Sequence, residues 1–402
     1  MTAEAAITYN EKVVRYFVVA AIAWGVVSMA IGLLIAAQLY WPALNFTSEY
    51  LNFGKLRPLH TNGVIYGFGT CMLMGTSLYI VQRTAKVGLL SDRLAWGVFW
   101  GWQLVLAAAV ITLPLGLTTS KEYAELEWPV DILIALTWIA YAVLFFGTLA
   151  RRRVPHIFVA NWFFGAFIFV IAVIFVVNNL AIPGGLSKSY SGLGGTPDAM
   201  VQWWGGHNAG GGLLTAGFIG MNYYFVPKVA ERPIYSYRLS ILHFWSIVGF
   251  YTWLGSHHLV YTTLPVWMQN LGIAMSILLW LPSWAGAYNS GMTILLNREK
   301  LRTDYTLMFF MSAVVYYALA TFEGPFLSIR AINVISHYTD WTVGHVHSGA
   351  LGWVGMSVFG VLYYLVPKLW RTELAFPGWI KYHFWLAHIG IVMYAVAPVS
   401  YT

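Results

Sequence analysis

The stretch DWTVGHVHSGALGWVGMSVFGVLYYLVP, residues 340–367, decides the fold. It places His345 and His347 at the start of an apolar run that is long enough to cross the roughly 30 Å hydrocarbon core of a bilayer as one helix. An imidazole in hydrocarbon is costly unless it has a partner, so two at this depth indicate a bound metal or haem. On a helix their side chains point about 200° apart. This segment can therefore lie between two cofactors.

The rest of the chain has the composition of a membrane protein. Hydrophobic residues make up 59% of the 402 residues and charged residues 9%, against roughly 25% charge in a soluble domain. The single cysteine, Cys71, excludes a disulfide within the chain, a paired-cysteine metal site and a Cys-x-x-Cys-His haem attachment. Any covalently bound c-type haem is therefore expected in another subunit. The first dozen residues lack a signal-peptide pattern, so the first apolar stretch is expected to be a retained helix.

Hydropathy predicts eleven membrane-spanning helices. Their approximate limits are 14–39, 57–82, 94–118, 130–150, 157–182, 199–227, 236–262, 267–292, 305–329, 341–367 and 378–399. With the N-terminus in the cytoplasm, all but five of the 22 Lys and Arg residues fall on the inner side, which agrees with the positive-inside rule. The five on the outer side are Lys55, Arg57, Lys121, Lys188 and Arg330. The sequence predicts an all-α polytopic bundle that forms a single domain, residues 1–402.

This topology brings six histidines from four helices to the outer part of the membrane. They are His60, His207, His257, His258, His345 and His347. A lone buried histidine is usually hydrogen-bonded to a neighbour, and we favour that interpretation for His243, His383 and His388. Six histidines at one depth are better explained as ligands.

The geometry of the helices allows one division of these six. A haem held from both faces needs rings on two helices, which suits His60 with either His345 or His347. The other member of that pair can hold a second haem on one face and leave the opposite face open. The three remaining histidines then offer three nitrogens to a copper ion. Such a centre, fed by an electron-transfer haem, is suited to oxygen reduction.

Several motifs resemble the catalytic subunit of cbb(3)-type cytochrome c oxidases, the C family of haem-copper oxidases. They are WWGGHN (203–208), GSHH (255–258), TFEGP (321–325), HYTDWTVGHVHSG (337–349), RPLHT (57–61) and YSYRLS (235–240). The resemblance implies a respiratory oxidase of the bacterial inner membrane that reduces oxygen to water and translocates protons. Membrane-anchored c-type cytochrome subunits would deliver the electrons, with soluble cytochrome c as the indirect donor.

The resemblance also assigns the ligands. It implies that His60 and His347 hold a low-spin b-type haem and that His345 holds a high-spin b-type haem. It implies that copper is bound by His207, His257 and His258. Two residues are well placed for the haem propionates on the outer side, Arg57 and His337. Glu122, in an acidic outer loop, is implied to bind a calcium ion that bridges to propionates.

One tyrosine discriminates between subfamilies. In A-type oxidases a redox-active tyrosine lies one turn after the first copper histidine, where this chain has Gly211. The C family places it on the next helix, where Tyr251 matches. Tyr251 lies seven residues before His258, so we expect both on one stripe of the predicted seventh helix. The resemblance implies a covalent link from Tyr251 to His207 and a role in donating a proton and an electron.

Protons are expected to reach this site from the inner side. The candidate path consists of side chains on the seventh and ninth helices, with waters between them: Tyr237, Ser240, Tyr317 and Thr321. The resemblance supports one such channel, of the K-like kind. Glu323 is a carboxyl inside the ninth span, which the resemblance places near the high-spin haem. A structural carboxyl bonded to a neighbour is an equally supported alternative.

The chain departs from the family around His207. Glycine replaces bulkier residues at four positions: Gly205, Gly210, Gly211 and Gly212. Each glycine within a helix costs up to about 1 kcal/mol relative to alanine, so we expect a wider copper pocket or a looser helix. The family also has a twelfth helix, which follows the eleven predicted in this chain.

Two other functions compete with the oxidase. A nitric oxide reductase of the same superfamily would hold iron in place of copper and need acidic residues near the metal, which Gly211 and its neighbours do not supply. A transporter would be expected to bind its substrate near the membrane midplane and between internal repeats. The histidines lie toward one face, and no internal repeat is evident.

Overall fold

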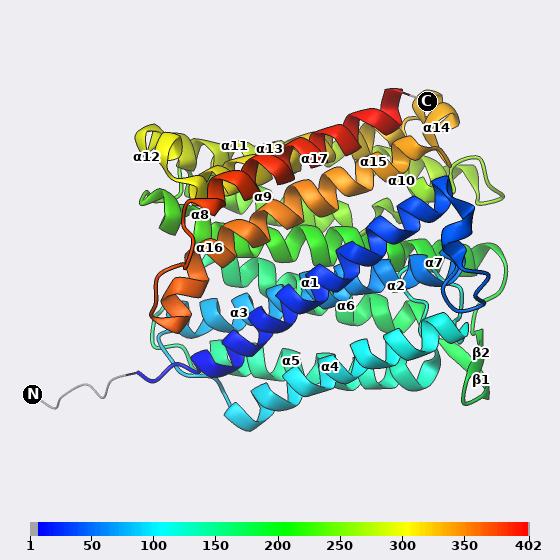
Figure 1. The fold of residues 1–402 in the computed structure, drawn as a ribbon, viewed down its shortest axis with the longest axis horizontal. Helices are drawn as coiled ribbons and strands as arrows, with labels where there is room; N and C mark the ends of the chain where they lie inside the picture. Colours follow the sequence, from blue (N-terminus) through cyan, green and yellow to red (C-terminus); the bar gives the residue numbers. More distant parts are fainter. Residues whose placement is uncertain (1–6, 401–402) are drawn as a thin grey trace, which may run out of the picture. The chain divides into compact units, whose positions relative to one another are not determined.

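A computed structural model describes the backbone of residues 7–400 and the side chains as far as Ala397. The chain divides into two compact units, Met1–Leu213 (unit 1) and Leu214–Thr402 (unit 2). In Figure 1 unit 1 runs from blue to green and unit 2 from green to red. Both units are helical, as the sequence predicts, and the described residues contain one pair of strands.

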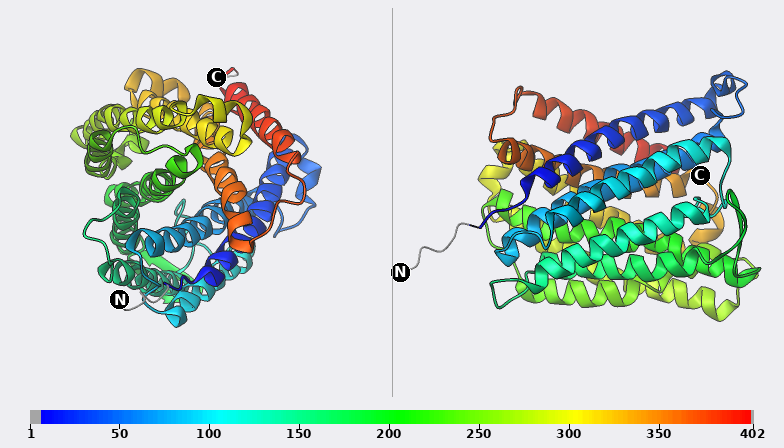
Figure 2. Two further views of the ribbon diagram at one scale, coloured as in Figure 1. Left: turned by 90° about the vertical axis from the view of Figure 1, so that its left-hand side faces the viewer. Right: turned by 90° about the horizontal axis from the view of Figure 1, so that it is seen from below.

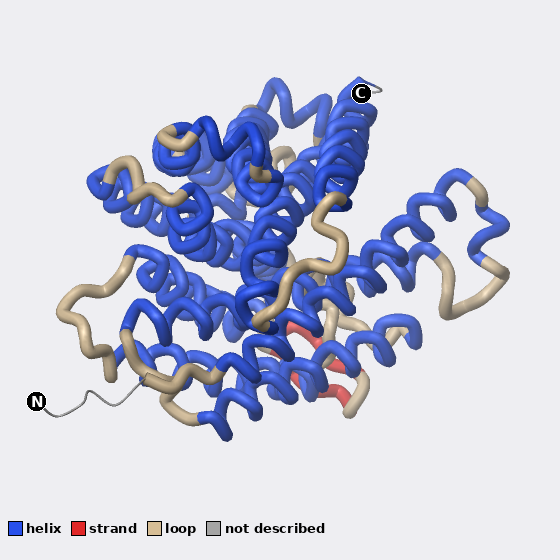
Figure 3. The backbone as a smooth tube through the Cα atoms, turned by 60° about the vertical axis from the view of Figure 1, so that its left-hand side comes forward, coloured by secondary structure: helices blue, strands red, loops and turns tan. Residues whose placement is uncertain are grey.

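Unit 1 is built from long helices that lie side by side (Figure 2). In chain order they are α1 (Glu11–Tyr40), the short η1 (Pro42–Asn45), α2 (Phe53–Asn62), η2 (Gly63–Gly69), α3 (Thr70–Ala85), α4 (Asp92–Leu115), α5 (Trp128–Ala150), α6 (Val159–Asn178) and α7 (Thr196–Asn208). Between α6 and α7 the chain forms an antiparallel hairpin, β1 (Ala181–Gly185) and β2 (Lys188–Ser191), red in Figure 3.

The centre of unit 1 is the continuous helix formed by α2, η2 and α3. In its apolar stretch 89% of the residues are buried, against 28% for α1. α1 packs closely against this central helix, because a Cβ atom on Gly67 would lie 2.8 Å from the Cβ of Trp24. A small residue at this point therefore lets the two backbones approach.

Unit 2 begins at Leu214, within a helical segment that continues from α7 and starts in unit 1. Its elements are η3 (Ala209–Gly217), α8 (Phe218–Ala230), α9 (Tyr237–Tyr251), η4 (Leu254–Leu259), α10 (Val266–Leu278), α11 (Trp280–Leu295), α12 (Arg298–Thr303), α13 (Tyr305–Ser328), α14 (Arg330–Ser336), α15 (Asp340–His347), η5 (Ser348–Gly355), α16 (Met356–Trp370) and α17 (Trp379–Ser400). Several helices begin where a polar side chain accepts a hydrogen bond from a first-turn N–H, as an N-cap does. Examples are Asn10, Ser91, Ser236 and Asp304.

Nine helices in the described part of the chain are long and apolar enough to cross a membrane, and each coincides with a predicted span. A tenth predicted span, 199–227, is helical throughout as α7, η3 and α8. The chain is therefore a multi-pass membrane protein with the predicted order of spans.

The prediction of one helix over 236–262 is wrong at its C-terminal end. α9 ends at Tyr251, and residues Leu254–Leu259 form a separate 3-10 helix, η4. The hydroxyl of Ser256 donates to the carbonyl of Met268 on α10 at 2.9 Å, which holds η4 against that helix. Tertiary hydrogen bonds thus replace the α-helical ones. Tyr251 and His258 consequently do not share one helical stripe.

Candidate metal and cofactor ligands

His60 lies in the last turn of α2 in unit 1, and its ring is held by α1. Its Nδ1 lies 2.8 Å from the carbonyl oxygen of Ser28. A Cβ on Gly32 would lie 2.5 Å from the ring, so glycine makes room for the imidazole. A carbonyl can only accept, so Nδ1 carries the proton and Nε2 presents its lone pair. This is how proteins orient a histidine that binds a metal through Nε2.

His345, on α15 of unit 2, is oriented by a carboxylate. Its Nδ1 lies 3.2 Å from Oε2 of Glu323 on α13, and the indole N–H of Trp341 donates to Oε1 at 2.7 Å. Residue 324 is a glycine, and a Cβ there would lie 3.3 Å from the imidazole. Glu323 is therefore bonded to two neighbours, one of which is a predicted haem ligand. The carboxylate is bonded to a neighbour, as the structural interpretation predicts, and that neighbour is the proposed ligand of the high-spin haem.

His347 follows two residues later on the same helix. Its Nδ1 lies 2.8 Å from the carbonyl oxygen of Val343, one turn earlier. The phenol ring of Tyr394 on α17 packs at 4.5 Å between ring centroids. Nδ1 again faces an acceptor, so Nε2 is the nitrogen available to a metal.

His257 and His258 lie side by side on η4. Their ring centroids are 4.4 Å apart at 78°, and each offers a nitrogen within 4.8 Å of the other's. Nδ1 of His257 lies 2.8 Å from the hydroxyl of Ser276, which itself donates to the carbonyl of Gly272 at 2.6 Å. Because the Ser276 hydroxyl donates its proton to Gly272, its oxygen accepts a hydrogen bond from Nδ1–H of His257. His257 therefore also presents Nε2.

The close approach of α10 to η4 depends on a glycine. A Cβ on Gly272 would lie 2.7 Å from the backbone nitrogen of His257 and 2.4 Å from the hydroxyl oxygen of Ser256. Real Cβ atoms do not approach backbone so closely, so a larger residue would displace the segment that carries both histidines. The hydropathy of α10 gives no sign of this requirement.

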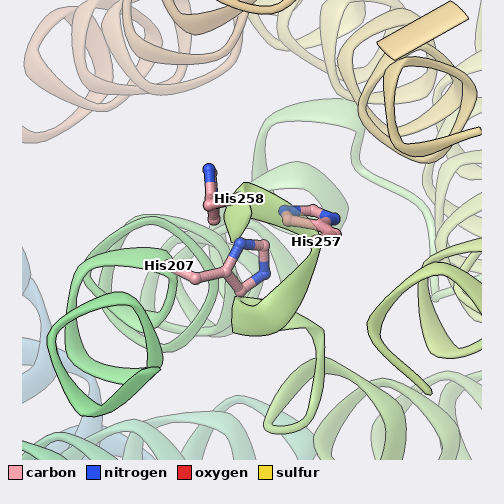
Figure 4. A group of neighbouring side chains, drawn as sticks. All are labelled: His207, His257 and His258. Atoms are coloured by element: carbon pink, nitrogen blue, oxygen red, sulfur yellow. The ribbon is translucent and has the colours of Figure 1, made fainter. Parts of the chain in front are cut away.

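His207 lies in the last turn of α7, in unit 1. Figure 4 labels it with the two histidines of η4, and shows that His257 and His258 leave the same short segment. At Gly205 the neighbouring space is filled, because a Cβ would lie 2.6 Å from the amide nitrogen of Asn178 on α6. At Gly210 no other described atom lies within 4 Å of the Cβ position. A Cβ on Gly212 would lie 3.1 Å from Cδ1 of Ile171 on α6, so of these three glycines only Gly210 has open space at the Cβ position. The wider copper pocket stays a prediction.

Each π-helical segment starts directly after a candidate ligand. η2, η3 and η5 begin three residues after His60, two after His207 and one after His347. π-Helical turns cost hydrogen-bond geometry and are frequent at functional sites. Glycines follow each of these three histidines in the sequence.

Tyr251 is the last residue of α9. Its hydroxyl lies 3.4 Å from the hydroxyl of Thr215 on η3. The predicted link to His207 stays a prediction.

The predicted proton-path residues lie in unit 2, and two of them, Ser240 and Tyr317, are hydrogen-bonded to side chains on neighbouring helices. The amide of Asn289 donates to Ser240 at 3.1 Å. His243 lies between two tyrosines: its Nδ1 is 3.0 Å from the hydroxyl of Tyr223 and its Nε2 is 3.2 Å from that of Tyr317. His243 is thus hydrogen-bonded, as predicted. Its position between Tyr223 and Tyr317 was missed because these tyrosines come from helices whose packing the sequence does not reveal.

The other path residues differ in their surroundings. The hydroxyl of Thr321 bonds to the carbonyl of Tyr317, one turn earlier. Tyr237 is largely exposed at the start of α9. Glu323 is hydrogen-bonded to Trp341 and His345, so it lies beside the candidate ligand and apart from these hydroxyl groups.

The loop between α4 and α5 carries the candidate calcium ligand. One carboxylate oxygen of Glu122 accepts from the guanidinium of Arg57 at 2.7 Å, so the predicted propionate-binding residue pairs with the predicted calcium ligand. Glu125 is buried and accepts from the amide of Asn62 at 3.0 Å. Burial raises the pKa of Glu125 above its usual range.

His337 precedes α15 and stacks on Tyr338 with ring centroids 4.0 Å apart. Partial burial lowers the pKa of His337, because desolvation disfavours the charged form. The ring N–H can donate a hydrogen bond to a propionate.

Membrane-spanning helices that carry histidines with Nδ1 facing an acceptor are suited to hold metals or haems through Nε2. The chain belongs to the haem-copper oxidase family: the family described as "Cytochrome C and Quinol oxidase polypeptide I" matches residues 12–401. Within it the chain falls in the cbb(3)-type branch, as a subunit I. The chain is 58% identical over 387 residues to the cbb3-type cytochrome c oxidase subunit CcoN1 of Stutzerimonas stutzeri, which covers 96% of this chain and 82% of that protein.

Other comparisons agree. The chain is 52% identical over 395 residues to cytochrome c oxidase subunit 1 of Rhodobacter capsulatus, covering 97% of this chain and 74% of that one. A solved structure of a heme-copper terminal oxidase dimer superposes with a TM-score of 0.74 at 16% identity, over 89% of this chain and 68% of that chain, which shows a similar fold. The chain is a terminal oxidase subunit and an oxidoreductase, and the family implies haem, copper and other subunits.

Proposed function

We propose that six histidines of this chain hold two b-type haems and one copper. In this assignment His60 and His347 hold the low-spin haem and His345 the high-spin haem. The copper ligands are His207, His257 and His258. The observation that carries the proposal is shared by four of the six: Nδ1 faces a carbonyl, carboxylate or hydroxyl acceptor in His60, His257, His345 and His347. That contact fixes the tautomer in which Nε2 binds a metal.

The bound metals would supply electrons and a site for oxygen, and this chain's residues supply protons and orientation. Glu323 holds the ring of His345 and raises its basicity. The phenol of Tyr251 would give a proton and an electron, and the covalent link to His207 would fix its position. The donors would be c-type cytochrome subunits of the complex, reduced by soluble cytochrome c.

Protons would enter from the cytoplasm through Ser240, Tyr223, His243 and Tyr317, and the amide of Asn289 would orient the hydroxyl of Ser240. Hydroxyl and imidazole groups can each release one proton while accepting another, so these groups suit transfer. Tyr317 lies close enough to Tyr251 to interact with it electrostatically. Tyr237 and Thr321 are proposed to extend the path with water molecules. Consumption of these protons, with translocation of others, would couple oxygen reduction to the membrane potential.

The remaining assignments follow from the outer loops. Arg57 and His337 would bind haem propionates, and Glu122 would share a calcium ion with them. The Arg57–Glu122 ion pair would then open or be bridged when the cofactors bind. The membrane would be the bacterial inner membrane, with the metal site toward the periplasm. Oxygen uptake by the purified complex with reduced cytochrome c, and proton release from vesicles containing it, test this function. A complex that binds the metals and consumes no oxygen would contradict it.

His60→Ala is expected to remove the low-spin haem spectrum and leave carbon monoxide binding at the high-spin haem. The reason is that His60 serves one iron in the proposed assignment. Absorption spectra of the reduced complex, with and without carbon monoxide, measure both. The matched control is His388→Gln, since His388 contacts Tyr316 through Nδ1 at 3.2 Å and is assigned no metal. Intact low-spin absorption in His60→Ala would overturn the assignment.

Ser240→Ala and Tyr317→Phe are expected to slow turnover by about 100-fold, the size of a typical proton-transfer contribution. Haem spectra should not change, because neither residue is assigned a metal. Stopped-flow oxygen reduction measures the rate. Thr112→Val serves as the control, because its hydroxyl donates to the carbonyl of Ala108 one turn earlier on α4 of unit 1 and has no proposed role in proton transfer. Turnover at the parent rate in both variants would place the path elsewhere.

Glu323→Gln is expected to raise the reduction potential of the high-spin haem by about 60 mV, a tenfold change in a one-electron equilibrium. Loss of the carboxylate makes His345 a weaker base, which disfavours the oxidised iron. Spectroscopic redox titration of both haems measures this, and the low-spin haem is the internal control. An unchanged potential would show that the carboxylate only packs against the ring.

A further inference from the structure

The hairpin β1–β2 is fixed to unit 1 through one face. Ser189 is 5% exposed, and its hydroxyl donates to Oε2 of Glu127 at 2.6 Å. At the tip, the carbonyl of Gly185 accepts from the indole N–H of Trp128 at 2.8 Å. A hairpin held at both points is a rigid part of the fold.

The opposite face of the hairpin is apolar and exposed. Side chains alternate along a strand, so Tyr190 points away from the buried Ser189. Ile182 pairs directly with Tyr190 across the hairpin, and each is 63% exposed. Leu186, in the turn, is 81% exposed. Three large apolar side chains are thus held outward by a rigid support, an arrangement typical of an interaction surface.

The tip of the hairpin lies at the level where α5 begins. Trp128, which bonds to Gly185, is the first residue of α5. Ile132, Leu136 and Ile139 follow it at spacings of four, eight and eleven residues, so they share its face of the helix. All three are largely exposed on a membrane-spanning helix. The tip of the hairpin therefore contacts the residue at which this exposed apolar stripe begins.

The composition of the hairpin face fits the boundary of a bilayer. Lys188 is its one charged residue, and its ammonium lies 5.7 Å from the ring of Tyr190. Tyrosine is enriched at membrane interfaces, and lysine extends its charge to the headgroups while its stem stays in apolar surroundings. We propose that the face formed by Ile182, Leu186 and Tyr190 is a lipid-binding surface, which lies among the headgroups and the adjoining acyl chains.

A label at the tip tests this directly. Cys71 is buried, so Leu186→Cys offers one accessible thiol in this chain for an environment-sensitive fluorophore. The complex carrying the label is reconstituted in phosphatidylcholine vesicles, with and without lipids that bear a nitroxide near the headgroup. Iodide serves as the aqueous quencher, and the parent complex gives the background. The control is Gly194→Cys, an exposed position with no described atom within 4 Å of its Cβ.

The label at position 186 is expected to lose emission with nitroxide lipid and to resist iodide, while the label at 194 responds mainly to iodide. The label at Ile182→Cys should respond as the label at Leu186→Cys does. Agreement between the two excludes a distortion caused by the substitution at the tip alone. Quenching at 186 by iodide alone would show that the hairpin stands in water. Protection from both quenchers would show that another protein covers it. Either result overturns the proposal.

Discussion

Tyr251→Phe is expected to slow oxygen reduction by at least about 100-fold, a loss of about 2.7 kcal/mol at 1.36 kcal/mol per tenfold. Reduction of oxygen to water takes four electrons, and the phenol of Tyr251 would provide one of them together with a proton. Phenylalanine keeps the ring and its packing at the end of α9 but removes the hydroxyl that faces Thr215 at 3.4 Å. Haem and copper contents should not change.

The control for this prediction is the same substitution at another tyrosine. Tyr363→Phe removes a hydroxyl that contacts Nδ1 of His383 at 2.7 Å, in a part of unit 2 with no proposed role in the reaction. Its oxygen uptake should stay near that of the parent. A fully metallated Tyr251→Phe enzyme with near-parent oxygen uptake would show that this tyrosine only packs and supplies no proton or electron to the reaction.

Gly272→Ala is expected to abolish copper binding although residue 272 binds no metal. The added Cβ would lie 2.7 Å from the backbone nitrogen of His257, and backbone at that distance has to move. Because η4 carries both His257 and His258, its displacement separates two proposed ligands from the third. Both haem spectra should remain. Copper analysis and the rate of oxygen uptake are the measurements.

Gly291→Ala is the matched control, because the nearest atom to a Cβ at that glycine is a side-chain carbon of Val314 at 3.8 Å, an ordinary contact. It should keep its copper. Full copper occupancy in Gly272→Ala would show that η4 tolerates movement, and that the glycine is not needed for the metal site.

Much of the fold could be predicted from the sequence, because hydropathy and charge determine which segments cross a membrane. In the described part of the chain, the nine helices that are long and apolar enough to cross a membrane coincide with predicted spans. The candidate ligands were also identifiable, since histidines at one depth in apolar helices are rare and the surrounding motifs are long.

The errors and omissions arise from tertiary contacts. The end of α9 at Tyr251 depends on bonds from η4 to α10, which helical periodicity does not contain. The role of Gly272 depends on the same packing. His243 looked like any buried histidine, and only the approach of Tyr223 and Tyr317 from other helices places it in a chain of exchangeable protons.

The hydrogen-bond acceptors that orient the candidate histidine ligands could not be predicted from the sequence either, except for one. Glu323 stood out as a charge within a span, whereas the carbonyl oxygens of Ser28 and Val343 carry no sequence signal. A backbone acceptor is available from any residue type, so only the packing of helices selects it.

The most direct test of the assignment is the metal and haem content of the purified complex, combined with its visible spectrum. The assignment predicts two b-type haems, one low-spin and one high-spin with carbon monoxide binding, and one copper for each copy of this chain. Non-haem iron in place of copper, or a single b-type haem, would contradict it.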